Sequence, residues 1–425
     1  MSDLREQLHI ALGASYTLGR ELGGGGTARV FLAFRRSSPR RSDAMVTTAP
    51  TPARRGPTQL LAPVLTALVV ASASGQQAPP PDAATHGTFT LPRFTFESGV
   101  TVPNVKVAYG TYGHLDAARS NAILLPSHYM ADHHGYDWLI GPGLALDTTR
   151  YFLIATELFG NGRSSSPSNT PEPFHGPRFP VATIRDNVEA VHRLLTEQLG
   201  IPHLRAIVGF SMGAEQAFQW GVSYPEFADR IVAIAGTARC WPHGVVRLES
   251  HVQALTLDSA FHGGDYATPP RRGIEQFALG WAPWLFSQEW WRQALWREMT
   301  PPAPTPDSAL TLLKSGFLAA DANDLILQAR TWQRHDVGRT TGAGGSTETA
   351  LRSIRVPVLY MPGETDLYFP VSDARYEARF IAHVTLVPIP SLWGHVAGAG
   401  PTPADKHFIS QRVAAFLRVR APARR

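Results

Sequence analysis

The sequence predicts an α/β fold in which a mostly parallel sheet carries helices on both faces and receives an inserted helical cap. Three observations predict it. Short, continuously apolar runs recur along the chain, which is typical of strands buried on both faces. Segments of helix length separate these runs, as the crossovers between parallel strands require. One interval between two runs is too long for a single crossover helix, which indicates an insertion.

The strands are predicted from two kinds of pattern. Alternating apolar and polar residues around 89–96 and 105–109 predict an opening antiparallel hairpin. Six continuous apolar runs then predict parallel strands at 122–126, 151–156, 206–210, 231–235, 358–361 and 384–387.

The long interval between the fourth and fifth runs is predicted to form the cap, at about 240–350. It is rich in proline and tryptophan, and it ends in a Gly/Thr/Ser loop at 338–349. Its tryptophans are Trp241, Trp281, Trp284, Trp290, Trp291, Trp296 and Trp332. We expect the cap to lie over the carboxyl edge of the sheet, where ligands bind in open α/β folds.

Composition excludes several classes of function. The chain is 44% hydrophobic and 17% charged, as in globular proteins, with a formal net charge of +5. Residues 1–75 hold nine Arg and four acidic residues, so the other 350 residues balance at 30 basic and 30 acidic. The folded part therefore has no excess positive charge for nucleic acid. Cys240 is the only cysteine, which excludes an internal disulfide and a multi-cysteine metal site. We expect no cofactor and no metal.

Residues 45–75 have the pattern of a secretory signal peptide. Arg54 and Arg55 precede an apolar run at 60–70, and small residues follow at 71–75. The alternative is a buried or membrane-spanning helix, but the run is shorter than the ~20 residues needed to span a bilayer, and Pro63 interrupts it. No cysteine follows to carry a lipid anchor. We expect an exported protein, periplasmic or extracellular, without a stable membrane anchor, or a cytoplasmic one if this signal is not used.

The flanking segments are predicted to have separate characters. Residues 16–31 resemble the first strand, glycine-rich loop and second strand of a bacterial serine/threonine protein kinase. The resemblance ends near residue 34, and no ATP-binding Lys strand, His-Arg-Asp loop or Asp-Phe-Gly motif follows. Residues 1–44 are therefore predicted to be a remnant without kinase activity. Residues 76–86 have the composition of a linker, and 87–425 are predicted to be the folded domain.

The strongest chemical signal surrounds Ser211. An apolar strand runs into Gly-Phe-Ser-Met-Gly at 209–213, and a helix-forming sequence follows. A Gly-x-Ser-x-Gly motif between a strand and a helix is the context of a nucleophile elbow, which exposes the serine hydroxyl at a sharp turn. A serine between glycines is more often only a turn, but the strand and helix on either side favour a catalytic nucleophile.

A serine nucleophile requires a base and an acid that orients the base. Asp366 follows the run at 358–361, and His395 follows the run at 384–387. Each stands in a loop after a predicted strand, so the three side chains can converge at one edge of the sheet. Glu364 is the nearby alternative for the acid and ranks below Asp366. The other candidates for the base, His133, His134 and His243, come too early in the chain for the order Ser, acid, His, and their spacing specifies no metal site.

An oxyanion hole is expected from two backbone N–H groups. One is that of Met212, the residue after the nucleophile. The other is expected in the loop at 127–130, with Met130 as first choice and Tyr129 as second.

These motifs together resemble the homoserine-transacetylase group of the α/β-hydrolase fold. The matching segments are 109–113 with 120–124, 140–143 with 146–148, 179–188 and the elbow itself. They run in order over nearly all of the predicted domain. The resemblance implies an acyl-serine intermediate and a cap that contributes to the pocket of the acyl acceptor.

Departures from the biosynthetic enzymes of this group bear on the reaction. Val396 follows the base where those enzymes have an Asp for the amino group of homoserine, and Ala278 stands where they have an Arg for its carboxylate. Phe210, Glu215 and Gln216 beside the nucleophile also differ. Binding a zwitterion without either partner leaves its charges unpaired. The sequence therefore favours an esterase.

Three functions remain open at this stage. The first is a serine ester hydrolase acting on a small-molecule ester. The second is an O-acyltransferase to a small acceptor, and the third is an exported binding protein that keeps the fold without the chemistry. The acyl chain, the alcohol and the oligomeric state stay open, a homodimer being one option.

Overall fold

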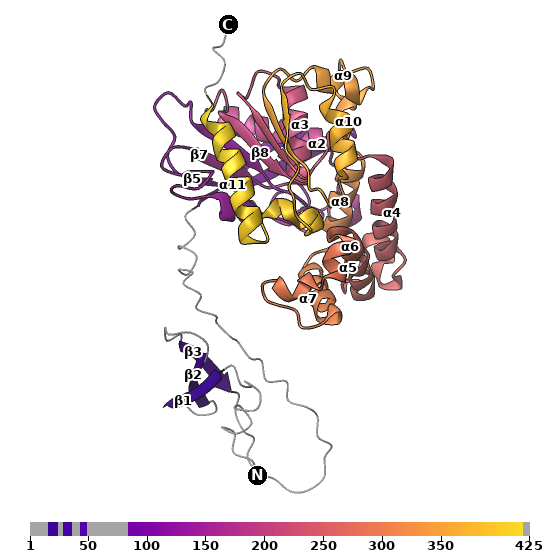
Figure 1. Cartoon of the computed structure of the whole chain (residues 1–425). Coiled ribbons are helices and arrows are strands. Elements are labelled where there is room, and N and C mark those ends of the chain that lie inside the picture. The colour runs from indigo at the N-terminus through magenta and orange to yellow at the C-terminus, as the bar shows by residue number, and fades with distance from the viewer. Residues whose placement is uncertain (1–15, 24–28, 36–42, 49–83, 420–425) are drawn as a thin grey trace. The chain divides into compact units, whose positions relative to one another are not determined.

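The computed structural model describes residues 16–23, 29–35, 43–48 and 84–419. The chain divides into two compact units, Met1–Ala83 and Ala84–Arg425 (Figure 1). In the first unit β1 (Tyr16–Gly23) pairs antiparallel with β2 (Arg29–Arg35), which pairs antiparallel with β3 (Asp43–Thr48). The first two strands flank the glycine run, as the kinase-like pattern predicts. The signal-peptide segment lies outside the described residues except for 45–48, which belong to β3.

The second unit is built on an eight-stranded sheet in the order β11-β10-β9-β8-β6-β7-β5-β4. The predicted opening hairpin is β4 (Thr85–Thr95) with β5 (Thr101–Tyr112), and β4 begins inside the predicted linker. The other strands are β6 (Ala122–Pro126), β7 (Phe152–Thr156), β8 (Ala206–Phe210), β9 (Ile231–Ile234), β10 (Val358–Met361) and β11 (Val384–Leu386). These six are parallel to one another, and β5 is antiparallel to both of its neighbours. The predicted fold class is confirmed.

Alternate residues of the central strands supply two separate hydrophobic cores. In β8, Ile207 packs into one core, whereas Ala206 and Val208 pack into the other. In the first core lie apolar side chains of α2 (Ile184–Arg193) and α3 (Met212–Ser223), and in the second lie those of α11 (Pro403–Arg418). Because both faces are covered, the strands are apolar throughout rather than alternating.

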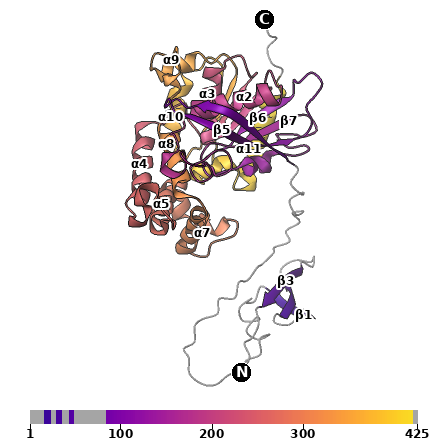
Figure 2. The same cartoon turned by 180° about the vertical axis from the view of Figure 1, so that it is seen from behind.

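The helices between β9 and β10 occupy the range predicted for the cap. They include α4 (Pro242–Thr256), α5 (Arg271–Leu285), α6 (Gln288–Arg292), α7 (Pro306–Leu318), α8 (Ala322–Gln333) and α9 (Thr347–Arg352). Helices α4 to α7 gather beside α8 on one side of the sheet (Figures 1 and 2). The last α-helix before α11 is α10 (Val371–Ala378), which follows β10.

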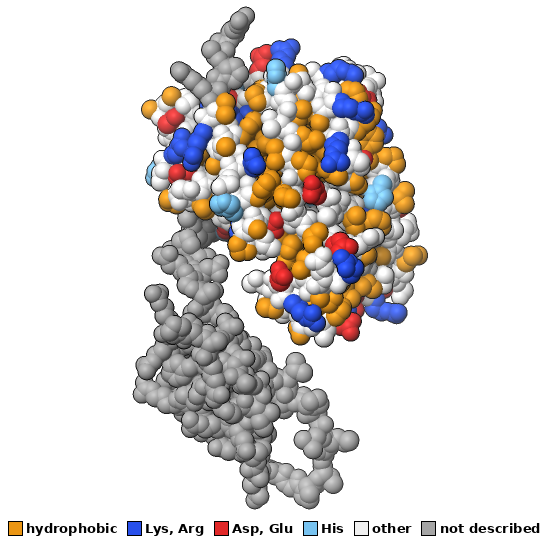
Figure 3. Space-filling model, in the orientation of Figure 1, with side chains coloured by type: hydrophobic (Ala, Val, Ile, Leu, Met, Phe, Trp, Pro, Cys, Tyr) orange, Lys and Arg blue, Asp and Glu red, His pale blue; other side chains and the backbone are white. Residues whose placement is uncertain are grey.

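The surface of this unit carries both signs of charge. On the face in Figure 3, basic and acidic side chains are interspersed among apolar and neutral ones rather than gathered by sign. This agrees with the balanced charge of the sequence after residue 75. Among the described residues, no helix is both long and apolar enough to cross a membrane.

Candidate active site

Ser211 lies at the sharp turn between β8 and α3, as the sequence predicts. Its backbone has φ 56° and ψ −125°, a conformation that a residue with a side chain rarely adopts. Such strain costs of the order of 1–3 kcal/mol and persists only where the surroundings impose it. Here the Ser211 N–H donates to the Ile234 carbonyl on β9 at 2.9 Å, which fixes the turn against the sheet.

Glycines are required around this turn because backbone atoms approach closely. A Cβ added at Gly209 would lie 2.0 Å from the Gly213 carbonyl oxygen, and one at Gly213 would lie 2.4 Å from the Pro126 carbonyl oxygen. Tyr136 reinforces the same region, since its hydroxyl donates to the Pro126 carbonyl at 2.6 Å and accepts from the Phe210 N–H at 3.0 Å. The elbow is therefore locked to the end of β6.

His395 joins Ser211 to Asp366 through two hydrogen bonds. Its Nδ1 lies 2.8 Å from Asp366 Oδ2, and its Nε2 lies 2.9 Å from Ser211 Oγ. A carboxylate only accepts, so Nδ1 carries the proton and Nε2 is free to accept from the serine hydroxyl. Asp366 Oδ1 also accepts from the N–H groups of Tyr368 and Phe369, at 2.7 and 3.1 Å. The carboxylate is thereby held in one orientation, and all three predicted residues meet in one buried site.

Aromatic rings enclose the imidazole. The His395 ring stacks on Phe210 with centroids 5.0 Å apart, and the rings of Tyr368 and Phe369 lie 4.7 and 5.5 Å away. Buried and surrounded by these rings, the imidazole forms its two hydrogen bonds in a medium of low polarity, which strengthens them. Phe210, which departs from the biosynthetic pattern, therefore forms one wall of the site.

The structure corrects the expected second donor of the oxyanion hole. The Met130 N–H donates to Gln328 Oε1 on α8 at 2.8 Å, so it is not free to bind a developing oxyanion. In the described part of the chain the Tyr129 N–H has no acceptor, and the Met212 N–H, at the first turn of α3, has none either. The preference for Met130 was therefore wrong. The contact that decides it comes from 198 positions further along the chain.

Two glutamines hold the loop that carries Tyr129. Gln216 on α3 donates from Nε2 to the Ser127 carbonyl at 2.9 Å, and Gln328 on α8 accepts from the Met130 N–H at 2.8 Å. The Tyr129 hydroxyl donates to the Leu325 carbonyl at 2.7 Å. Gln216 was singled out by sequence only as a departure from a pattern. Its position gives it a structural role in placing the loop against the elbow.

The remaining candidates lie outside the site. Glu364 is exposed and makes no contact with His395. His133 pairs with Glu157 at 2.6 Å, His134 with Asp137 at 2.9 Å, and the His243 ring packs on Trp284. Cys240 is buried, and burial raises the pKa of its thiol. Within the described ranges, no group of three or more His, Cys, Asp or Glu residues could hold a metal.

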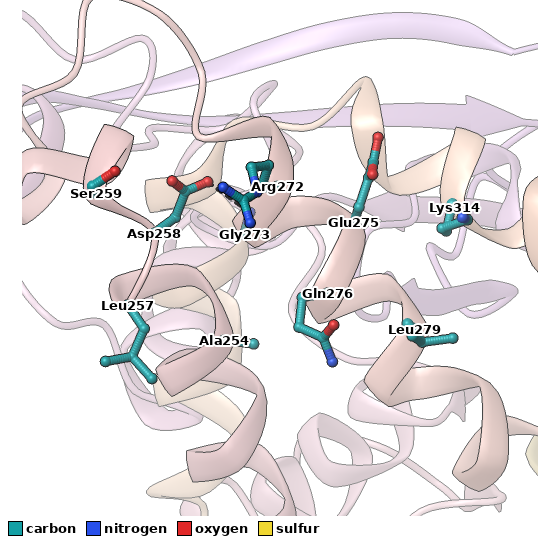
Figure 4. A pocket seen from close by; sticks show the side chains of 10 residues that line it. All are labelled: Ala254, Leu257, Asp258, Ser259, Arg272, Gly273, Glu275, Gln276, Leu279 and Lys314. Carbon is teal, nitrogen blue, oxygen red and sulfur yellow. Dashed lines mark hydrogen bonds between the residues drawn. The ribbon is translucent and has the colours of Figure 1, made fainter.

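Two surface grooves are lined by residues other than Ser211, Asp366 and His395. One of about 520 Å³ lies between α4, α5 and α7, with Asp258, Glu275, Gln276 and Lys314 on its walls (Figure 4). The other, of about 480 Å³, is lined by Met130, Gly160 and Gln328 among others, and so borders the oxyanion loop. Only the second adjoins the chemistry described above.

Comparison with known proteins places this geometry in a family. The family model described as "alpha/beta hydrolase fold" matches residues 124–400. The chain belongs to the α/β-hydrolase family. It is 36% identical over 322 residues to the ethyl acetate hydrolase of Pseudomonas veronii, covering 73% of this chain and 90% of that protein. It is 29% identical over 321 residues to a homoserine O-acetyltransferase of Chlorobium chlorochromatii, covering 72% and 88%.

A solved structure agrees with these relatives. The acetylester hydrolase from Corynebacterium glutamicum superposes with a TM-score of 0.76 at 33% identity, covering 78% of this chain and 96% of that one. The resemblance of this α/β hydrolase to the homoserine-transacetylase group is confirmed. Its relatives include esterases as well as acetyltransferases, so the activity is that of an esterase or an acyltransferase.

Proposed function

We propose that this α/β hydrolase is a carboxylic ester hydrolase that works through an acyl-serine intermediate on Ser211. The observation that carries the proposal is the unbroken chain of hydrogen bonds from Ser211 through His395 to Asp366. A serine hydroxyl is a weak nucleophile, and a base in contact with it is the requirement for its activation.

In the proposed reaction, His395 Nε2 takes the proton of Ser211 as Oγ attacks the ester carbonyl carbon. The N–H groups of Met212 and Tyr129 stabilise the oxyanion that forms, a contribution of about 10²–10³ per donor in comparable sites. The imidazolium returns its proton to the leaving alcohol. Water then gives a proton to His395 Nε2 as its oxygen attacks the acyl carbon. The bond from that carbon to Ser211 Oγ breaks, His395 returns the proton to Oγ, and the carboxylic acid leaves. Asp366 stabilises the imidazolium and keeps its proton on Nδ1 throughout.

Hydrolysis is favoured over acyl transfer by the two substituted positions. Val396 is half-buried beside the base, and Ala278 is fully buried on α5, so neither supplies a charge for a zwitterionic acceptor. Transfer to a different small alcohol is the second candidate, supported by the similarity to homoserine O-acetyltransferases.

The proposal is tested by steady-state hydrolysis of p-nitrophenyl acetate and ethyl acetate by the wild type, His395→Gln and Asp366→Asn. We expect kcat to fall by about 10⁴ or more in both variants, because one loses the base and the other holds the wrong tautomer. Variants that fold normally and keep wild-type kcat would refute the triad. Activity on either ester with no dependence on His395 would do the same.

We also propose that the enzyme is exported by the segment at 45–75 and matured near Gln76. Arg54, Arg55, the apolar run 60–70 and the small residues 71–75 support this. N-terminal sequencing of the protein from its native host tests it. A start near Gln76 is expected, and Met1 on an exported protein would contradict cleavage.

A further inference from the structure

A buried arginine with no hydrogen-bond partner lies beside the proposed active site. Arg247 projects from α4, and only 3% of its surface is exposed. In the part of the chain that the structure describes, its Nε, Nη1 and Nη2 atoms have no hydrogen-bond acceptor. Burying a guanidinium without an acceptor is unfavourable, because the group loses its hydration and gains no hydrogen bond in return.

Aromatic rings shared with the site surround this guanidinium. Its carbon lies 5.2 Å from the ring centre of Trp281, 4.5 Å from that of Trp332 and 4.0 Å from that of Tyr368. Since the Tyr368 ring centre is 4.7 Å from that of His395, the guanidinium carbon is no more than 8.7 Å from the imidazole centre. The Trp281 ring also lies 4.9 Å from that of Tyr129, the proposed oxyanion residue.

No buried acid among the described residues pairs with Arg247. Asp366 is committed to His395 and to two backbone N–H groups. Glu215 is fully buried, and neither of its oxygens bonds to the guanidinium or to any other described group. Burial, and secondly the neighbouring Glu377, raises the pKa of Glu215, whereas Arg247 lowers it. Arg247 keeps its proton even when desolvated, so its positive charge lies buried without a hydrogen-bonded counter-ion.

A second buried N–H donor without an acceptor belongs to a ring that packs on Arg247. The indole Nε1 of Trp281 is also buried and unpartnered. The spot thus offers several N–H groups and one positive charge, which is the complement of a carboxylate. A neutral ester can accept a hydrogen bond there, but it brings no negative charge to balance the guanidinium.

We propose that Arg247 is an anion subsite and that the preferred esters of this enzyme carry a carboxylate. The inference rests on the proposed ester hydrolysis and names the substrate class of that site. The carboxylate belongs either to the acyl group, as in the monoester of a dicarboxylic acid, or to the alcohol, as in an acetylated hydroxy acid.

The test compares charged esters with neutral esters of matched length. Monoethyl succinate, glutarate and adipate are paired with the ethyl esters of monocarboxylic acids, and acetoxyacetate is paired with ethyl acetate. Wild-type enzyme is expected to show a higher kcat/KM on one charged arm by about 10- to 100-fold, the contribution of a hydrogen bond to a charged group. The arm that responds identifies which side of the ester Arg247 contacts.

Arg247→Met is expected to abolish this preference, measured as the ratio of kcat/KM on each charged ester to kcat/KM on its neutral partner. Arg247→Lys keeps the positive charge and should retain part of the preference for charged esters. Arg239→Met is the matched control, because Arg239 also stacks on a tryptophan, at 5.1 Å from the Trp241 ring centre, yet is partly exposed and lies on the short segment before α4. It removes the same charge and should leave the preference intact.

Stability gives a second measurement that does not depend on turnover. Replacing an unpaired buried charge by an apolar side chain is neutral or stabilising, so the Tm of Arg247→Met should equal or exceed that of the wild type. Equal use of charged and neutral esters by the wild type would overturn the subsite while leaving ester hydrolysis in place. Failure on every ester would instead refute the proposed function. A large loss of Tm together with a uniform loss of activity in Arg247→Met would show that Arg247 serves only packing.

Discussion

Replacing Gln328 by leucine should slow ester hydrolysis by weakening the loop that supplies the oxyanion donor. Gln328 is 2% exposed, its Oε1 accepts from the Met130 N–H at 2.8 Å, and its Nε2 donates to the Gly160 carbonyl at 2.6 Å. Leucine leaves both backbone groups without their partner, at a cost of about 1–3 kcal/mol in stability. It also releases the Met130 N–H next to that of Tyr129, so the loop can shift.

The expected kinetic signature is a fall in kcat with little change in KM, because the oxyanion forms only in the transition state. Complete loss of an oxyanion donor lowers kcat by about 10²–10³-fold. For a donor that is only partly displaced, we expect kcat to decrease by about 10- to 100-fold. Hydrolysis of p-nitrophenyl acetate under saturating conditions measures kcat, and urea unfolding measures stability.

Two further variants separate the loop from general destabilisation. Gln328→Glu keeps the acceptor for the Met130 N–H but loses the donor to the Gly160 carbonyl, and should recover part of kcat. Gln219→Leu removes another buried glutamine, whose Nε2 donates to Ser223 and Thr340 at 2.8 Å each, and should lose stability without losing kcat. Wild-type kcat in Gln328→Leu, or an equal loss in Gln219→Leu, would refute the reasoning.

Three other perturbations have defined outcomes. Gly213→Ala should reduce kcat at least 100-fold, because its Cβ would meet the Pro126 carbonyl oxygen at 2.4 Å, whereas Gly316→Ala on α7, with no atom within 4 Å, should be neutral in the same esterase assay. Burial, and secondly Arg247, lowers the pKa of His251 in the folded protein to about 3. As the pH drops below 6.5, the unfolded chain binds a proton at His251 while the folded protein does not, so the stability falls. Between pH 7 and pH 5, the free energy of unfolding measured in urea should therefore fall by about 2 kcal/mol less in His251→Leu than in the wild type. With acetyl-CoA and excess homoserine, the wild type should release more free acetate than O-acetylhomoserine. Val396→Asp combined with Ala278→Arg should raise the fraction of acetyl groups transferred to homoserine. A wild type that forms mainly O-acetylhomoserine would contradict esterase action.

The sequence predicts the parts of this fold whose cause is local. An apolar run in the sequence predicts each buried strand, as at 122–126 and 206–210, because a strand covered on both faces needs no polar residue. The positions of Asp366 and His395 follow from the same strands, since loops at one edge of a parallel sheet converge. Ranking Asp366 above Glu364 agrees with the observed contact to His395.

The parts that sequence could not predict depend on contacts between distant segments. The sequence places both Met130 and Tyr129 in the expected loop and does not show that Gln328 on α8 accepts the Met130 N–H. Arg247 has no local signal, since a lone arginine on a helix is usually solvated. Only the packing of α4 with α5, α8 and the loop after β10 reveals that it is buried among Trp281, Trp332 and Tyr368.

The central claim is that Ser211 is the nucleophile that carries the acyl group. Intact-protein and peptide mass spectrometry after treatment with a fluorophosphonate tests it most directly, because this reagent forms a stable adduct only with an activated serine. We predict one adduct per chain, located on Ser211, and no adduct in Ser211→Ala, whose ester hydrolysis should fall by about 10⁶ while its Tm stays within a few degrees of the wild type. An adduct on any other residue, or retained hydrolysis by purified Ser211→Ala, would contradict the account.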